Sequence, residues 1–79
     1  MKPEYLLSRG FKLVGEDDGY EYIINQYGGY SDHIFYNIKE KRLCVQYNNN
    51  FIELYDCTMQ KINSAFRLVG LPKLGDFRP

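Results

Sequence analysis

Residues 20–47 read YEYIINQYGGYSDHIFYNIKEKRLCVQY and contain three runs rich in aromatic and β-branched residues, which favour strands. The runs cover residues 20–27, 33–38 and 43–47. Gly28 and Gly29 suit positive φ after the first run, and the polar residues 39–42 form a turn after the second. This pattern predicts antiparallel strands joined in hairpin order.

Further strands are expected on both sides of this segment. Residues 11–15, FKLVG, place Lys12 between apolar side chains before Asp18 and Gly19, a pair typical of tight hairpin turns. The asparagines at 48–50 favour another turn. Residues 51–54 then form either a fifth short strand or the lead-in to a final helix, so that the sheet has four or five strands.

A helix is predicted at each end of the chain. Pro3 suits a first helical turn and Gly10 suits a left-handed end, which predicts a short helix over about 3–9. The C-terminal helix is indicated by apolar residues on one face at Met59, Ile62, Phe66 and Val69. Asp56 or Thr58 can cap its start, and Gly70 ends it.

The fold class that follows is α+β, in one domain over residues 1–72 with a flexible tail at 73–79. At 79 residues the chain is too short for a second domain. The C-terminal helix should pack across one sheet face, because alternate strand residues are consistently apolar. These residues are Tyr20, Tyr22, Ile24, Ile34, Tyr36, Ile38, Leu43, Val45 and Tyr47.

The opposite face of the sheet is also partly apolar, because alternation places Ile23, Tyr27 and Phe35 there. One interpretation is that the N-terminal helix or the tail, with Leu74 and Phe77, covers these residues. The other is that the face is open and contacts a partner. An exposed apolar face of this kind could also join two copies of the chain in a homodimer.

Two further features favour partner binding. The loop around Tyr30 combines tyrosine with glycine, serine and aspartate, the composition of adaptable binding surfaces. Asp17 and Asp18 lie in an acidic turn that would attract a basic partner. The candidate partner-binding residues are Ile23, Tyr27, Tyr30, Phe35, Asp17 and Asp18.

Several chemistries lack the residues they need. Ten basic residues balance ten acidic ones, so a large nucleic-acid-binding surface is not expected. His33, Cys44 and Cys57 are too few and too far apart for structural zinc, and no phosphate-binding loop or nucleophile motif is present. We expect no cofactor, no metal and no catalytic site.

The chain contains no apolar run of membrane-spanning length and no signal-peptide core. A cytoplasmic protein without membrane contact is the expectation. In that compartment both cysteines should remain free thiols.

Two resemblances bear on function. Residues 6–11, LLSRGF, followed by Ser31, Asp32 and His33 entering a strand and by a final helix, resemble HicA-type mRNA interferases. That resemblance implies an RNA-binding or RNA-cleaving toxin domain with His33 as the catalytic residue.

The richness in tyrosine, asparagine, isoleucine and lysine, together with the short length, is similar to small accessory proteins of phages and mobile elements of low-GC bacteria. Some of those proteins inhibit host defence proteins. The favoured hypothesis is a small non-enzymatic protein-binding module, with a phage-encoded inhibitor as its specific form. The HicA-like toxin is the alternative.

Overall fold

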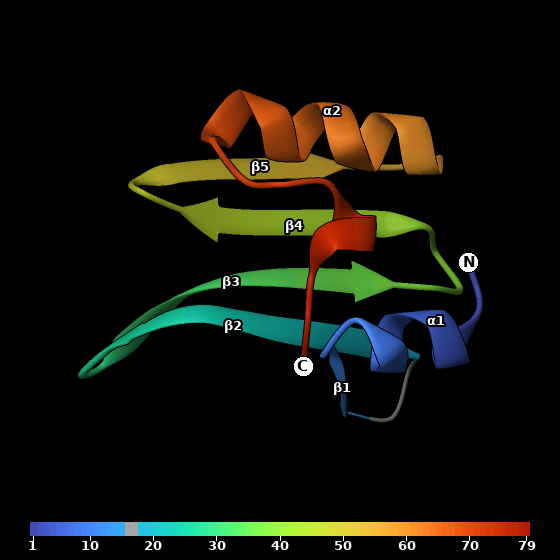
Figure 1. Cartoon of the computed structure of the whole chain (residues 1–79), viewed down its shortest axis with the longest axis horizontal. Coiled ribbons are helices and arrows are strands. Elements are labelled where there is room, and N and C mark those ends of the chain that lie inside the picture. The colour runs from blue at the N-terminus through green and yellow to red at the C-terminus, as the bar shows by residue number, and fades with distance from the viewer. Residues whose placement is uncertain (16–17) are drawn as a thin grey trace.

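The computed structural model describes residues 1–15 and 18–79, and it has the expected α+β class, with five strands in one antiparallel sheet in the order β1-β2-β3-β4-β5 (Figure 1). The elements are α1 (Pro3–Ser8), β1 (Lys12–Val14), β2 (Gly19–Tyr27), β3 (Tyr30–Asn37), β4 (Arg42–Tyr47), β5 (Asn50–Leu54), α2 (Met59–Val69) and a 3-10 turn, η1 (Leu74–Asp76). The region 51–54 is therefore part of a fifth strand.

Each hairpin follows from its turn residues. Asn48 and Asn49 have φ of 51° and 65°, as a two-residue type I′ loop between β4 and β5 requires. Gly28 supplies a positive φ at the β2–β3 loop. The hairpin expected around residues 16–19 is confirmed by β1–β2 pairing, although residues 16 and 17 lie outside the described part of the chain.

A bulge changes the face of the last residues of β2. Ile23 lies opposite His33, but the next paired residue, Asn25, lies opposite Asp32. A one-residue shift of this kind moves all later side chains to the other face. The prediction that Tyr27 shares a face with Ile23 is therefore wrong, because Tyr27 points to the side that carries the helices.

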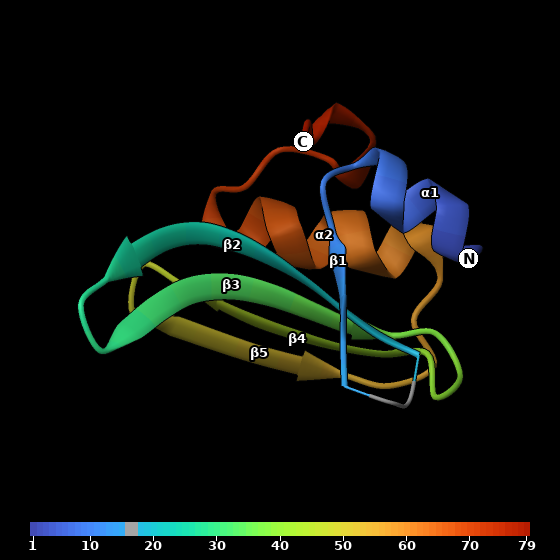
Figure 2. The ribbon, with the colours of Figure 1, turned by 90° about the horizontal axis from the view of Figure 1, so that it is seen from below.

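Helix α2 packs across the sheet as expected (Figure 2). The Thr58 hydroxyl accepts a hydrogen bond from the Lys61 backbone N–H at 3.2 Å, and Gly70 ends the helix at a φ of 89°. The buried residues of α2 are Ile62, Ala65, Phe66 and Val69. Met59 was expected in this set but is 40% exposed, since it lies in the first turn, at the margin of the sheet.

The C-terminal residues are packed, which corrects the expectation of a loosely held tail over 73–79. Leu74 and Phe77 are buried, and the Phe77 ring lies 4.9 Å from Tyr22 and 5.5 Å from Phe66 between centroids. The Arg9 side chain also donates to the Gly75 carbonyl at 2.7 Å. The two apolar side chains anchor the segment on the core.

Both helices and the C-terminal segment lie on the same side of the sheet (Figure 2). The core forms between them and the inward strand residues, including Ile34, Tyr36, Leu43 and Val45. The interpretation in which α1 or the tail covers the opposite face is therefore wrong. No helix among the described residues is long and apolar enough to cross a membrane.

Candidate functional site

The sheet face that no described helix or loop covers, here called the open face, is the candidate site. The strand register assigns its members by alternation. They are Lys12, Val14, Glu21, Ile23, Gln26, Ser31, His33, Phe35, Asn37, Arg42, Cys44, Gln46, Phe51 and Glu53. The face thus mixes apolar side chains with charges of both signs.

Phe35 lies near the centre of the open face, between Glu21 on β2 and Cys44 on β4. Its ring lies over Gly19, where a Cβ atom would come within 2.7 Å of the ring carbon Cε2. On the other side the Arg42 guanidinium lies 5.6 Å from the ring centroid, a cation–π distance. Neighbours on two strands therefore fix the position of a half-buried aromatic ring.

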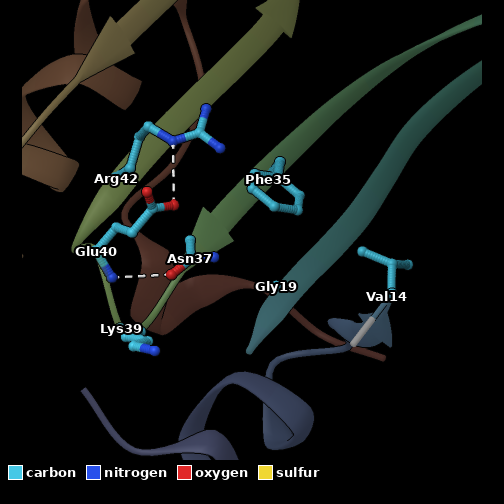
Figure 3. A pocket seen from close by; sticks show the side chains of 8 residues that line it. Val14, Gly19, Phe35, Asn37, Lys39, Glu40 and Arg42 are labelled. Atoms are coloured by element: carbon cyan, nitrogen blue, oxygen red, sulfur yellow. Dashed lines mark hydrogen bonds and ion pairs between the residues drawn. The ribbon is translucent and has the colours of Figure 1, made fainter. Parts of the chain in front are cut away.

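A hollow of about 490 Å³ lies beside this ring (Figure 3). Its lining residues are Val14, Gly15, Gly19, Phe35, Asn37, Lys39, Glu40 and Arg42. The Asn37 side-chain oxygen accepts a hydrogen bond from the Glu40 backbone N–H at 2.8 Å, which holds the β3–β4 turn against the hollow. The result is an aromatic wall beside a rim that carries Lys39 and Glu40.

Arg42 connects the hollow to the next strand. Its Nε lies 3.6 Å from Glu40 Oε1, and its Nη1 donates to Glu53 Oε2 at 3.2 Å. The same Nη1 lies 3.2 Å from Cys44 Sγ, and that thiol lies 3.5 Å from Glu53. Partial burial, and then the hydrogen bond to the Glu53 carboxylate, raise the pKa of Cys44. The thiol is therefore protonated at neutral pH and a weak nucleophile.

His33, the residue of the toxin resemblance, lies on the open face between Ile23 and Gln46. Its Nδ1 is 3.1 Å from the Ser31 carbonyl oxygen and 3.3 Å from the Ser31 hydroxyl. The carbonyl can only accept, so this contact favours the tautomer with hydrogen on Nδ1. Nε2 is then the proton-accepting nitrogen.

The structure separates the sequence-predicted residues into three groups. Ile23, 45% exposed, and half-buried Phe35 share the open face. Tyr27 and Tyr30 lie at the tip of the β2–β3 hairpin on the helix side. Asp18 lies just before β2, at the opposite end of that strand from the tip, and Asp17 is outside the described residues.

The hairpin tip is a small aromatic cluster of its own. The Tyr27 and Tyr30 rings are 5.1 Å apart, and the Tyr27 hydroxyl donates to Asp32 Oδ2 at 3.2 Å. Partial desolvation and then the nearby Asp32 charge raise the pKa of Tyr27. Tyr30 is 67% exposed, so the tip presents aromatic surface that is separate from Phe35.

Sequence reasoning missed the surroundings of Phe35. The sequence places Arg42 in the polar turn over residues 39–42, and it indicates Gly19 only as a turn residue. The two-residue alternation of a strand places Arg42 on the same face as Cys44, and Glu53 lies opposite Cys44 on β5. The close approach of Gly19 to the ring has no signal in the sequence.

Among the described residues, no group of three or more histidine, cysteine or acidic side chains could hold a metal ion, and both cysteines are free thiols. Comparison of the chain with protein-family models, curated proteins and solved structures found no match.

Proposed function

We propose that the chain is a non-enzymatic protein-binding module and that it contacts its partner through the open face, around Phe35. The observation that supports this most is the one-sided packing. Both helices and the C-terminal segment lie on one face. The other face presents exposed Ile23, and it presents Val14 and Phe35 beside a hollow. Exposed apolar surface with a polar rim is typical of protein-binding sites.

The chemistry of the partner follows from that surface. An apolar or aromatic side chain fits against the Phe35 ring, and groups of both charges can pair with the rim at Lys39 and Glu40. Asp18 adds a negative charge at one end of the face, consistent with a partner that has basic residues there. The resemblance to phage accessory proteins favours a host defence protein as the partner.

The test is capture of a protein by the tagged full chain from a bacterial phage-host lysate, with two matched variants. Phe35→Asp places a charge on the open face, and Leu7→Asp places one on an exposed position of α1, across the sheet. We expect one near-stoichiometric protein that Phe35→Asp loses and Leu7→Asp keeps, with both variants folded by circular dichroism. Capture that survives Phe35→Asp would refute the proposed surface.

A milder variant distinguishes ring position from charge. Gly19→Ala adds a methyl group where the Phe35 ring now lies, so the ring must shift while the polarity of the face stays the same. We expect binding to weaken without loss of the fold. Unchanged binding would show that the position of the Phe35 ring does not matter.

The second candidate is the RNA-cleaving toxin, and the observation that favours it is the His33 tautomer, which leaves Nε2 as a base. In that case capture recovers RNA, and His33→Ala abolishes cleavage or toxicity while Phe35→Asp does not. The protein-binding proposal expects His33→Ala to leave partner capture almost unchanged.

A further inference from the structure

Strand β5 differs from the other edge of the sheet. It is five residues long, whereas β1 at the opposite edge has three, and no described strand pairs with its outer side. Natural edge strands are usually protected by lysine, proline or a bulge. β5 reads NFIEL, without lysine or proline, and its register with β4 is regular.

The free hydrogen-bonding groups of β5 can be identified from its hairpin. In a hairpin with a two-residue loop, the flanking residues, here Tyr47 and Asn50, form a hydrogen-bonded pair through their backbone N–H and C=O groups. The direction of the backbone N–H and C=O groups alternates along an antiparallel strand. Those of Ile52 and Leu54 therefore also point toward β4. The backbone N–H and C=O of Phe51 and Glu53 therefore point outward from the sheet.

An apolar groove runs along this edge, between β5 and α2. Its lining includes Ile52 and Leu54 from β5 and Ser64, Ala65 and Leu68 from α2. Leu68 is 82% exposed, the highest value among the large hydrophobic residues that are exposed in the described chain. The free strand edge and the apolar groove thus lie side by side.

We propose that two copies of the chain associate through this edge, β5 antiparallel to β5, which joins their sheets into one continuous sheet. A twofold axis at Ile52 places Phe51 of each copy opposite Glu53 of the other, so that their outward backbone groups form hydrogen bonds in both directions. The partner at this edge is therefore a second copy, because the outward backbone groups of β5 are complementary to those of another β5.

The charges agree with this pairing. Glu53, the only charged residue of β5, lies opposite Phe51 of the second copy, and Arg42 of its own chain already compensates its charge at 3.2 Å. On the helix side the two α2 helices approach along Ser64 and Leu68. A stable dimer needs about 800 Å² per partner, about 15% of the 5248 Å² surface of the chain. The open face stays uncovered, so the dimer would present two adjacent copies of it.

Sedimentation equilibrium of the full chain, from about 1 μM to about 1 mM, tests the proposal. Leu68→Asp puts a charge in the groove at an exposed position, and Leu13→Asp does the same at the opposite edge. We expect a monomer–dimer equilibrium whose dissociation constant rises at least about tenfold with Leu68→Asp and stays within about twofold with Leu13→Asp. A monomer over the whole range, or a dimer that Leu68→Asp leaves intact, would overturn the proposal.

A second pair of variants tests the backbone pairing. Phe51→Pro removes an outward N–H but no bond to β4, and Phe51→Ala removes the side chain and keeps that N–H. Both should fold, and Phe51→Pro should weaken the dimer clearly more than Phe51→Ala. Equal effects would contradict the strand pairing. A dimer broken by Phe35→Asp instead of Leu68→Asp would mean that the open face, not the edge, joins the copies.

Discussion

The two faces of this sheet are built from alternate residues of the same strands, but one face is buried and the other is open. On the covered face, Ile34, Leu43 and Val45 are fully buried against α2 and the C-terminal segment. On the open face, Phe35 and Cys44 stay half-buried beside the Arg42–Glu53 ion pair. The comparison separates residues that stabilise the fold from residues that are available for a partner.

The largest expected difference between the faces concerns stability. Phe66→Ala removes a fully buried ring from the covered side and should lower the free energy of unfolding by about 3–5 kcal/mol. Phe35→Ala removes a half-buried ring with one cation–π contact and should cost about 1 kcal/mol. Urea denaturation of both variants measures the difference. Equal losses would mean that the open face is part of the structural core.

The C-terminal segment provides the next test, because it determines which face is covered. Leu74 is almost fully buried, and its backbone N–H donates to the Asn63 side chain at 2.9 Å. Leu74→Ala should therefore cost about 2–5 kcal/mol in the same denaturation experiment. Lys73→Ala, an exposed neighbour, is the control and should change little. A loss of less than about 0.5 kcal/mol for Leu74→Ala would mean that the C-terminal segment is loosely held.

A smaller effect is expected at the start of α2. Thr58→Ala removes the hydroxyl that accepts from the Lys61 N–H and should cost about 1 kcal/mol. Thr58→Ser keeps a capping oxygen and should retain most of that stability. If serine and alanine destabilise the protein equally in thermal unfolding, the hydroxyl is not the group that matters.

The smallest expected effect is a shift in the titration of Cys44. Because partial burial and then Glu53 raise its pKa, alkylation of this thiol should begin at higher pH than in an unfolded peptide. Glu53→Gln should lower that pH, and Glu40→Gln, which does not contact the thiol, should change it less. Peptide mass spectrometry separates Cys44 from Cys57. No difference between the two variants would contradict the assigned cause.

The same shift has a consequence for stability. A raised pKa in the folded state means that the native protein holds this proton more tightly than the unfolded chain does. The Cys44 contribution to stability is therefore complete below the ordinary thiol pKa and is lost as pH rises through the folded value. The free energies of unfolding of the Cys44→Ala variant and the wild type should approach each other as pH rises through the alkaline range.

Much of the fold could be predicted from the sequence, since alternation, turn residues and the helical periodicity of Ile62, Phe66 and Val69 are local signals. The β2 bulge could not, because nothing near Ile24 indicates a register shift, and it moved Tyr27 to the other face. The packing of Phe77 was also missed, since its partners Tyr22 and Phe66 are distant in the chain.

The candidate site was predicted only in part, for a related reason. Ile23 and Phe35 were identified because period 2 places them on one face, and the strand register confirms that placement. The contacts that position Phe35 depend on which strands are neighbours in the sheet. The order of the strands cannot be derived from residue composition. Gly19 and Arg42 became part of the site only once the register of β2, β3 and β4 was known.

Site-specific photo-crosslinking is the measurement that tests the central claim most directly. A photoreactive phenylalanine analogue is placed at position 35 or 23 on the open face, at 30 on the hairpin tip, or at 7 on α1, and each version is exposed to the lysate used for capture. The open-face account predicts a crosslink to one protein from positions 35 and 23 and none from 7. A crosslink from position 7 or 30 alone, with none from 35, would contradict it.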